Sequence, residues 1–452
     1  MTDTRDASLD RADFFRTVDL RGRHLNRTEL KAAVPRVHEE SNQQAEEAVR
    51  GIIAEVRARG HQALRELAQR FDGVVLDSVR VPREALRDAL AGLDAGVRAA
   101  LEESIDRARR FAEAQRPADV ETVLAEGAVV RQRWIPVNRV GLYVPGGLAP
   151  LASSVVMNVV PALAAGVESV ALASPPQKDF GGLPHPTILA AAELLGVEEV
   201  YAIGGAQAIV SFAYGVPADG PEEALEAVDL VTGPGNVFVA TAKKLVRGVV
   251  GIDSEAGPTE IAILADETAQ PTLVAADLIS QAEHDPRASS VLVTSSVDLA
   301  DAVREELLRQ ARTARHSERI LTALSGPQSG VVLVDGLEQG IAVADAYAAE
   351  HLEIMTADAP AVAARIRNAG AIFVGDYSPV SLGDYCAGSN HVLPTSGTAL
   401  FSSGLNVTTF LRAVQEIEYS RQGLSEVRTH IEELAEAENL PSHGEAVSIR
   451  FR

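Results

Sequence analysis

Apolar residues recur at helical spacing in the first quarter of the chain and in short runs after it. Residues 41 to 115 carry Ala, Leu, Ile and Val at every third or fourth position among Glu and Arg, which predicts two or three long amphipathic helices. The stretch from Val120 to Pro136, which includes VVRQRWIPV, is typical of short strands. The chain therefore begins with a helical region.

From Val140 the pattern changes to short apolar runs that alternate with helical runs. The runs VGLYV, SVALAS, EVYAI and VDLVT each precede a helical segment, and a second series of this kind begins near Ile261 with IAILAD. Such alternation predicts parallel sheets with helices on both faces. We find no fixed-period repeat. The fold class is thus α/β, with two doubly wound, incomplete Rossmann-like units.

The end of the chain has a third pattern of apolar and polar residues. SEVRTHIEELAEAENL predicts one helix with an acidic face, and PSHGEAVSIRFR predicts a short extended tail. This segment is too small to fold alone, so we expect it to pack against another part of the protein.

Composition excludes several classes of protein. The 452 residues include 41 Lys plus Arg against 63 Asp plus Glu, and a net charge of −22 argues against a nucleic-acid partner. The single cysteine, Cys386, excludes an internal disulfide and a Cys-rich metal site. The N-terminus has no apolar signal core, and Asn158, Pro161 and Glu168 interrupt the most apolar stretch. We expect a cytoplasmic protein with no membrane partner.

Three glycine-containing segments follow predicted strands of the first unit. They are VPGG (144–147), GGAQ (204–207) and GPGN (233–236). Singly, each is more typical of a turn, and none has the GxGxxG spacing. Together, at the carboxyl ends of neighbouring strands, they favour a nucleotide cleft, because glycines let a phosphate approach the backbone.

The second unit holds titratable groups at element boundaries. Gln281 and His284 lie three positions apart on a predicted helix, where a metal site and a hydrogen-bonded core histidine are both open interpretations. Glu350 and His351 close another predicted helix; they are either two proton acceptors in a cleft or a surface pair.

The polar segment GDYCAGSNHVLPT (383–395) predicts a loop. Its Asp384 and His391, with Gln281 and His284, would give an N/O ligand set suited to Zn²⁺. Cys386 in the same loop is a weaker candidate, as a nucleophile toward an aldehyde, because nothing around it suggests a lowered pKa. His443 alone would be taken for a solvated tail residue.

Five segments in this order resemble those of the histidinol dehydrogenase family. They are IDSEAGPTEI (252–261), QAEHD (281–285), AAEHLEI, GDYCAGSNHVLPT and LPSHGEAV. The similarity runs from about residue 40 to the end. It implies an enzyme of histidine biosynthesis that oxidises L-histidinol to L-histidine through the aldehyde, with Zn²⁺ and two molecules of NAD.

The resemblance also implies roles for individual residues. The acid/base pair falls on Glu350 and His351. The zinc ligands fall on Gln281, His284, Asp384 and His443, the last reaching in from the partner subunit of a homodimer with shared active sites. NAD contacts fall on Tyr143, Gln207 and Asn236. Substrate contacts fall on Thr259, Gln281, His284, His351, Asp384, His391, Glu438 and His443.

The resemblance divides the chain into four parts. Residues 1–38 form an N-terminal arm, with a short helix around Arg11 to Val18 and a disordered opening. Residues 39–142 and 260–405 form a discontinuous main α/β domain that carries the metal and acid/base residues. Residues 143–259 form an inserted Rossmann-like NAD-binding domain, and residues 406–452 a C-terminal helix and tail that complete the partner's site.

Two other functions stay open. One is a related zinc- and NAD-dependent alcohol dehydrogenase for a sulfonated diol, although Glu438 with His391 favours the cationic histidinol. The other is a nucleotide-binding regulatory or scaffold protein, which would be expected to have lost some site residues.

Because the family also has alanine at the position of Cys386, we expect its thiol to be dispensable.

Overall fold

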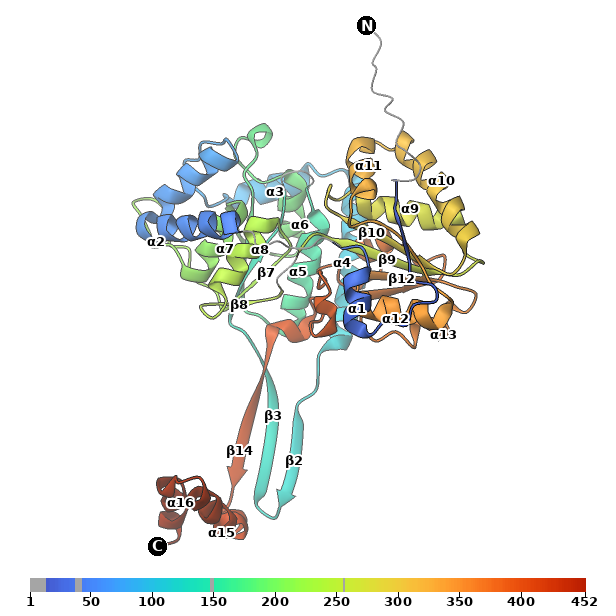
Figure 1. The fold of residues 1–452 in the computed structure, drawn as a ribbon. Coiled ribbons are helices and arrows are strands. Elements are labelled where there is room, and N and C mark those ends of the chain that lie inside the picture. Colours follow the sequence, from blue (N-terminus) through green and yellow to red (C-terminus); the bar gives the residue numbers. More distant parts are fainter. Residues whose placement is uncertain (1–13, 37–42, 147–149, 255–256) are drawn as a thin grey trace.

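The computed structural model describes residues 14–36, 43–146, 150–254 and 257–452. Figure 1 shows two α/β bodies side by side above a long ribbon of strands that ends in a pair of helices. The expected α/β class with two doubly wound units and a helical tail is confirmed.

The first body is built on a five-stranded parallel sheet in the order β6-β5-β4-β7-β8. In chain order this is 3-2-1-4-5, so the winding direction reverses between β4 and β7. The strands are β4 (Arg139–Tyr143), β5 (Ser169–Ser174), β6 (Glu199–Ala202), β7 (Leu230–Thr232) and β8 (Gly251–Ile252). The connecting helices are α5 (Ala152–Ala165), α6 (Pro186–Leu194), α7 (Gly205–Tyr214) and α8 (Val237–Val246).

The helices predicted before Gln115 are confirmed and pack on this first body. They are α2 (Gln43–Phe71), α3 (Arg83–Ala91) and α4 (Ala95–Gln115). Helix α2 packs on α7 and α8, α3 on α6, and α4 on α5, within one apolar core. This packing differs from the expected grouping of 39–142 with 260–405. An amphipathic pattern predicts that one face of a helix is buried, but not which sheet buries it.

The second body repeats the winding of the first. Its parallel sheet has the order β1-β11-β10-β9-β12-β13. The strands are β9 (Glu260–Ala265), β10 (Ser289–Thr294), β11 (Gly330–Leu333), β12 (His351–Met355) and β13 (Ala371–Val374), with β1 (Thr17–Asp19) at the edge. Its helices are α9 (Pro271–Ala282), α10 (Val297–Thr313), α11 (Ser317–Ser325), α12 (Leu337–Tyr347), α13 (Ala359–Ala363) and α14 (Val380–Tyr385).

The N-terminal segment differs from its prediction. Residues 11–13 of the expected helix lie outside the described residues, but Thr17–Asp19 forms strand β1, parallel to β11. The sequence pattern alone does not reveal an unpaired sheet edge. A helix instead follows at α1 (Arg27–Ala33), which begins with a capping box between Asn26 and Glu29. It packs on α12.

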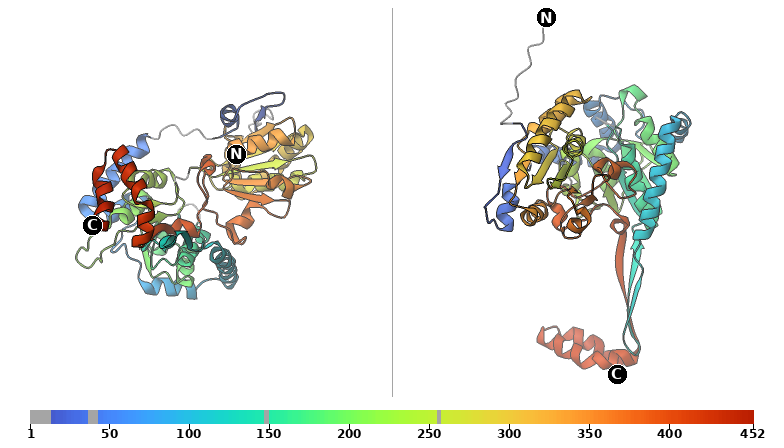
Figure 2. Two further views of the ribbon diagram at one scale, coloured as in Figure 1. Left: turned by 90° about the horizontal axis from the view of Figure 1, so that it is seen from below. Right: turned by 90° about the vertical axis from the view of Figure 1, so that its right-hand side faces the viewer.

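The ribbon is an antiparallel sheet with β3 in the centre. It consists of β2 (Val120–Ala125), β3 (Ala128–Pro136) and β14 (Leu411–Tyr419). Two helices follow, α15 (Arg421–Ala437) and α16 (Pro441–Ser448), at the end of the ribbon away from the two bodies (Figures 1 and 2). The expected extended tail is therefore wrong: Pro441 begins a helix, a position where proline is well tolerated. No helix in the described part of the chain is long and apolar enough to cross a membrane.

Candidate active site

Glu350 and His351 lie where the chain turns from α12 into β12. Helix α12 ends at Tyr347, and Ala348 has a left-handed backbone (φ 49°) that ends the helix. His351 is the first residue of β12, so the pair does not close a helix as expected. Both residues are buried, at 6% and 4% exposed, which rules out the surface pair.

A chain of hydrogen bonds fixes the Glu350 carboxylate. Its Oε2 accepts from the Thr259 hydroxyl at 2.5 Å and from the backbone N–H of Glu260 at 2.9 Å. The Gln281 amide in turn donates to the Thr259 hydroxyl. Oε2 also lies 3.5 Å from Nδ1 of His351. Residues predicted to serve catalysis, substrate and metal are thus brought together at the amino ends of β9 and β12.

The imidazole of His351 has one occupied and one free nitrogen. Nδ1 lies 3.2 Å from the backbone oxygen of Glu260, whereas Nε2 is buried without a hydrogen-bond partner among the described residues. Burial acts to lower the pKa of His351, but the charge and hydrogen bond of Glu350 outweigh it, and the pKa is raised. The pair can therefore hold and release a proton at Nε2.

A buried ion pair, which the sequence did not reveal, underlies this site. Arg36 lies 3.3 Å from the Glu260 carboxylate, stacks over the Tyr347 ring at 4.1 Å and donates to the Tyr347 carbonyl. Burial raises the pKa of Glu260 to about 7, against the opposing charge of Arg36 and with the repulsion of Glu350. Because residue 36 is more than two hundred positions from residue 260, no local pattern could predict the contact.

The predicted metal-ligand positions Gln281, His284 and Asp384 come from two helix ends. Gln281 is in the last turn of α9 and fully buried, and its Oε1 has no partner in the described structure. His284 lies just beyond α9, with a side chain 45% exposed and Nε2 3.9 Å from Asp384 Oδ2. This exposure excludes a core histidine. Asp384 lies in α14, where we expected loop.

His391 lies beside Asp384. Its Nδ1 is 3.7 Å from Asp384 Oδ1 and 3.1 Å from the Asp384 backbone oxygen, and its Nε2 is 3.2 Å from the Ser154 hydroxyl of α5. Burial lowers the pKa of His391 although Asp384 opposes the shift, which favours the neutral ring. The contact with Ser154 joins the two bodies at the candidate site.

An amide oxygen, an imidazole and a carboxylate fit a Zn²⁺ ion, and the unpartnered Oε1 of Gln281 is the atom that such an ion would satisfy. Three protein ligands leave one position to fill. In the described parts of the chain no group of three or more His, Cys, Asp or Glu side chains is arranged to hold a metal ion. His443 and Glu438 are both exposed, one on α16 and the other after the last residue of α15, at the far end of the ribbon (Figure 1).

The predicted cofactor residues lie at the carboxyl edge of the first sheet. Tyr143 ends β4 and is buried; its hydroxyl accepts from the Gly205 N–H at 3.0 Å, and burial raises its pKa to about 12. Gln207 is buried in the first turn of α7. Asn236 caps α8 and accepts from two of its N–H groups. The three glycine segments are the expected strand-to-helix turns, although Gly147 lies outside the described residues.

A buried ion pair that sequence reasoning missed anchors the third glycine turn. Lys243 donates to the Gly233 carbonyl at 3.1 Å and pairs with Asp253, whose other oxygen accepts from the Gly233 N–H at 2.9 Å. Gly233 has φ 117°, and a Cβ there would lie 2.0 Å from the Tyr143 carbonyl oxygen. Only glycine fits this position, where the backbone after β7 passes the end of β4.

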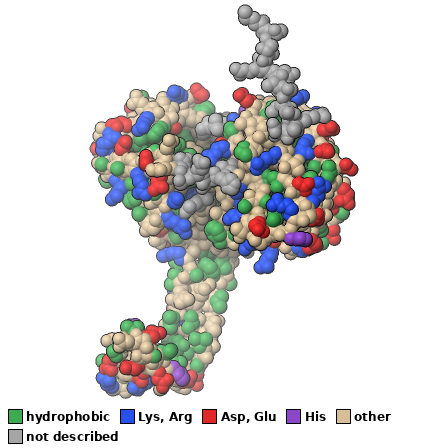
Figure 3. All heavy atoms as spheres, in the orientation of Figure 1, with side chains coloured by type: hydrophobic (Ala, Val, Ile, Leu, Met, Phe, Trp, Pro, Cys, Tyr) green, Lys and Arg blue, Asp and Glu red, His purple; other side chains and the backbone are tan. Residues whose placement is uncertain are grey.

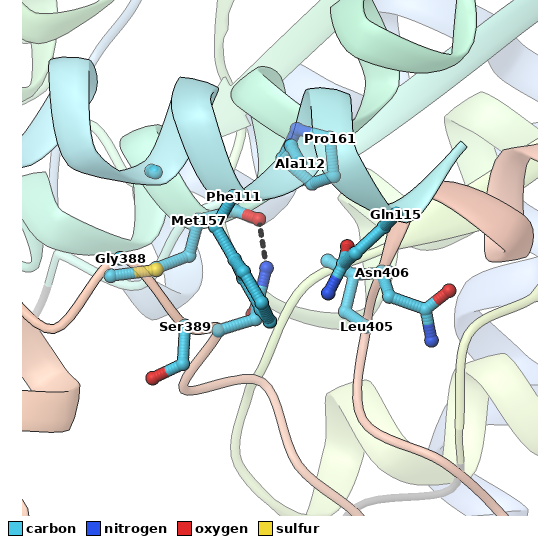
Figure 4. A pocket seen from close by; sticks show the side chains of 11 residues that line it. Phe111, Ala112, Gln115, Met157, Pro161, Gly388, Ser389, Leu405 and Asn406 are labelled. Carbon is cyan, nitrogen blue, oxygen red and sulfur yellow. Dashed lines mark hydrogen bonds between the residues drawn. The ribbon is translucent and has the colours of Figure 1, made fainter.

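A pocket lies behind the loop that carries His391. It is lined by Phe111 and Ala112 of α4, by Met157 and Pro161 of α5, and by Gly388 to Asn390 of the loop, and Figure 4 shows Pro161 next to Ala112. The amide of Asn390 donates to the Met157 carbonyl at 2.6 Å and fixes the loop to α5. Since no candidate site residue lines this pocket, it supports the loop and does not form part of the site.

Fold and site together define an α/β protein with two doubly wound parallel sheets, one of which carries a buried carboxylate–imidazole pair. Residues 36–451 match the family model described as histidinol dehydrogenase. A histidinol dehydrogenase of Thermobifida fusca is 62% identical over 96% of this chain and 97% of its own, and one of Nocardia farcinica is 61% identical with the same coverage.

A solved structure agrees with these relatives. The crystal structure of histidinol dehydrogenase from Elizabethkingia anophelis superposes with a TM-score of 0.89 at 31% identity, over 97% of this chain and 98% of that one. The chain belongs to the histidinol dehydrogenase family. It is therefore an oxidoreductase, and the interpretation as a regulatory or scaffold protein is not favoured.

Proposed function

We propose that this chain oxidises L-histidinol to L-histidine through L-histidinaldehyde, with one Zn²⁺ per subunit and two successive molecules of NAD, as the last step of histidine biosynthesis in the cytoplasm. The observation that carries the proposal is the hydrogen-bonded chain Gln281–Thr259–Glu350, which ends beside the imidazole of His351, whose Nε2 has no partner among the described residues. It joins a metal-ligand position, a substrate position and an acid/base pair.

The acid/base chemistry follows from the two nitrogens of His351. Nδ1 is held by the Glu260 carbonyl, so Nε2 is free to accept the alcohol proton while the carbon-bound hydride leaves to NAD. Water then adds to the aldehyde, and Glu350 accepts its proton. The resulting hydrate loses a second hydride to a second NAD and yields the carboxylate.

Four residues would hold zinc, namely Gln281, His284 and Asp384 of one subunit and His443 of the other. When bound, the ion would orient the substrate's imidazole and amino groups and act only secondarily as a Lewis acid. Thr259, His391 and Glu438 would complete the substrate site. The carboxylate of Glu438 suits the ammonium group of histidinol, and no observation favours a sulfonated diol.

Tyr143, Gln207 and Asn236 would contact NAD. They lie at the carboxyl edge of a sheet of order 3-2-1-4-5. Strand β4, which ends at Tyr143, and strand β7, which precedes Asn236, meet where the winding reverses. This switch point is the usual binding place in doubly wound sheets.

The position of α16, far along the ribbon from the site, supports a homodimer with shared active sites (Figure 1). The ribbon and tail also expose apolar side chains that a second copy would cover. Among them are Val123 at 66%, Ile417 at 70% and Leu434 at 63% exposed. Figure 3 shows hydrophobic side chains along the ribbon. Apolar surface of this extent marks an interaction site.

The decisive experiment measures NADH formation from L-histidinol and NAD before and after chelation, with histidine quantified at the end. We expect two NADH per histidine, lost on metal removal and regained with Zn²⁺. A dimer that binds zinc and NAD but does not oxidise histidinol would contradict the proposed substrate. Sulfonated alcohols would then be assayed.

A further inference from the structure

Asp72 lies beside the candidate cofactor cleft, although it comes from outside the first α/β unit. It follows the last residue of α2, and its N–H donates to the Ala68 carbonyl at 2.9 Å. A Cβ placed on Gly204 would lie 3.3 Å from Asp72 Oδ1 and 3.1 Å from Pro175. The carboxylate thus lies over the carboxyl ends of β5 and β6.

The same neighbourhood holds two of the predicted cofactor residues. Gly205, the next residue after Gly204, donates to the Tyr143 hydroxyl, and a Cβ on Gly205 would lie 3.1 Å from the Gln207 side chain. The charge of Asp72 also contributes to the raised pKa of Tyr143. Asp72, Tyr143 and Gln207 therefore surround one turn.

One oxygen of the half-buried Asp72 carboxylate has no partner in the described structure. This atom, Oδ2, is buried without a hydrogen-bond partner. The side chain of Lys178 lies near the neighbouring Gly73 but forms no ion pair with Asp72 among the described residues. Burial raises the pKa of the carboxyl to about 6. A buried carboxylate oxygen without a hydrogen-bond donor costs stability. The position of Oδ2 therefore favours a bound ligand that donates a hydrogen bond to it.

Dinucleotide folds use such a carboxylate. An acidic residue near the end of the second strand accepts from the ribose hydroxyls of NAD and disfavours the 2′-phosphate of NADP. Here the second strand is β5, and it is followed by Ser174, Pro175, Pro176 and Gln177, with no acid. The Asp72 carboxylate and Pro175 both lie next to Gly204, so the carboxylate is close to the end of β5, where the missing acid would be needed.

We propose that Asp72 accepts hydrogen bonds from the adenosine ribose hydroxyls of NAD and excludes NADP. The inference rests on the proposed use of NAD and adds the residue that selects between the two cofactors. The helical segment before the sheet thereby becomes part of the cofactor site, which gives a function to its packing on α7 and α8.

The test compares Asp72→Asn with wild type in the zinc-loaded dimer, by calorimetric titration with NAD and NADP and by steady-state kinetics. We expect about tenfold weaker NAD binding, which matches the loss of a hydrogen bond to a charged group. The preference for NAD over NADP should fall by at least as much, while zinc content and the KM for histidinol stay unchanged.

A matched control removes the same charge close by. Asp179 in the 3₁₀ turn Lys178–Phe180 is exposed, so Asp179→Asn should leave both cofactor affinities unchanged. The thermal midpoint of the protein without cofactor separates binding from structure. Because Asp72→Asn removes a half-buried charge whose Oδ2 has no partner in the described structure, that midpoint should stay equal or rise while NAD affinity falls.

Three results would contradict the inference. Wild-type NAD affinity and cofactor preference in Asp72→Asn would remove Asp72 from the site and leave the proposed function intact. A lower thermal midpoint that accompanies the weaker binding would make Asp72 a structural residue; Asp72→Ser then repeats the comparison. If wild-type protein binds no NAD at all, the proposed function fails first, and the inference with it.

Discussion

The backbone carbonyl of Glu260 lies 3.2 Å from Nδ1 of His351, and this contact assigns the tautomer of the imidazole. A carbonyl oxygen only accepts, so Nδ1 carries the hydrogen and Nε2 is the basic nitrogen. The N–H of the same residue donates to the Glu350 carboxylate at 2.9 Å. One peptide segment thus orients both members of the acid/base pair.

The substitution Glu350→Gln tests the role of this pair. We expect zinc and histidinol binding to persist while net formation of histidine falls by about 10²- to 10⁴-fold, since the water that hydrates the aldehyde loses its base. The measurement is histidine formed per NADH. Normal turnover would exclude Glu350 from catalysis.

The pH profile of the same variant tests the raised pKa of His351. In the wild type, activity is lost as the pH falls through that pKa, because the protonated ring cannot accept the alcohol proton. Without the Glu350 charge, the pKa of His351 falls. The acidic limb of the pH profile of kcat/KM for the first oxidation therefore moves to lower pH. An unmoved limb would show that Glu350 does not set this pKa.

Shared sites predict complementation between two inactive variants. His443→Ala should lose zinc and activity together, and His351→Asn should lose activity but keep zinc. In a hybrid dimer one site receives an intact set from both chains, so an equal mixture should recover about a quarter of wild-type activity. No recovery after hybrids have been verified by mass would contradict the shared site.

Local patterns predicted most elements of the fold. The helices from Gln43 to Gln115 and both doubly wound units follow from periodicity, which acts over a few residues. Strand β1 and the site of packing of α2 to α4 could not be predicted in this way. The position of β1 depends on which edge of the second sheet is unpaired, and the packing of α2 to α4 depends on which sheet and helices have an uncovered apolar face.

The candidate site was predicted only in part. Its residues came from motifs, but the chemistry depends on contacts across the fold, such as the Thr259 hydroxyl on Glu350 and the stacking of Arg36 on Tyr347. Residues such as Lys243 and Asp72 lack a distinctive motif. Lys243 stands out only by its buried ion pair with Asp253, and Asp72 only by its buried Oδ2, which has no partner in the described structure.

The thiol of Cys386 offers a negative test. Cys386 follows α14 and is partly buried, and its backbone N–H donates to the Leu382 carbonyl at 2.9 Å. We expect Cys386→Ala to keep near-normal turnover, because alanine preserves the backbone next to Asp384. A large loss of activity with zinc still bound would revive the thiol as a nucleophile.

Lys243→Met tests whether the buried pair holds the cofactor turn. Removal of the ammonium leaves Asp253 buried and unpaired, which should cost about 3–5 kcal/mol of stability, measured by chemical unfolding. NAD affinity should fall with it, because Gly233 loses a hydrogen bond and Asn236 follows on the same turn. The neighbouring exposed Lys244→Met should change neither quantity.

The double variant Lys243→Met, Asp253→Leu separates positioning from stability. An apolar pair of similar volume should recover much of the lost free energy of unfolding, since no unpaired charge is left. The Gly233 N–H and carbonyl still lack their side-chain partners, so weak NAD binding should persist while zinc content and histidinol affinity stay normal. If NAD affinity recovered along with stability, the pair would be needed only for folding, and the turn would be fixed by Gly233 packed against Tyr143.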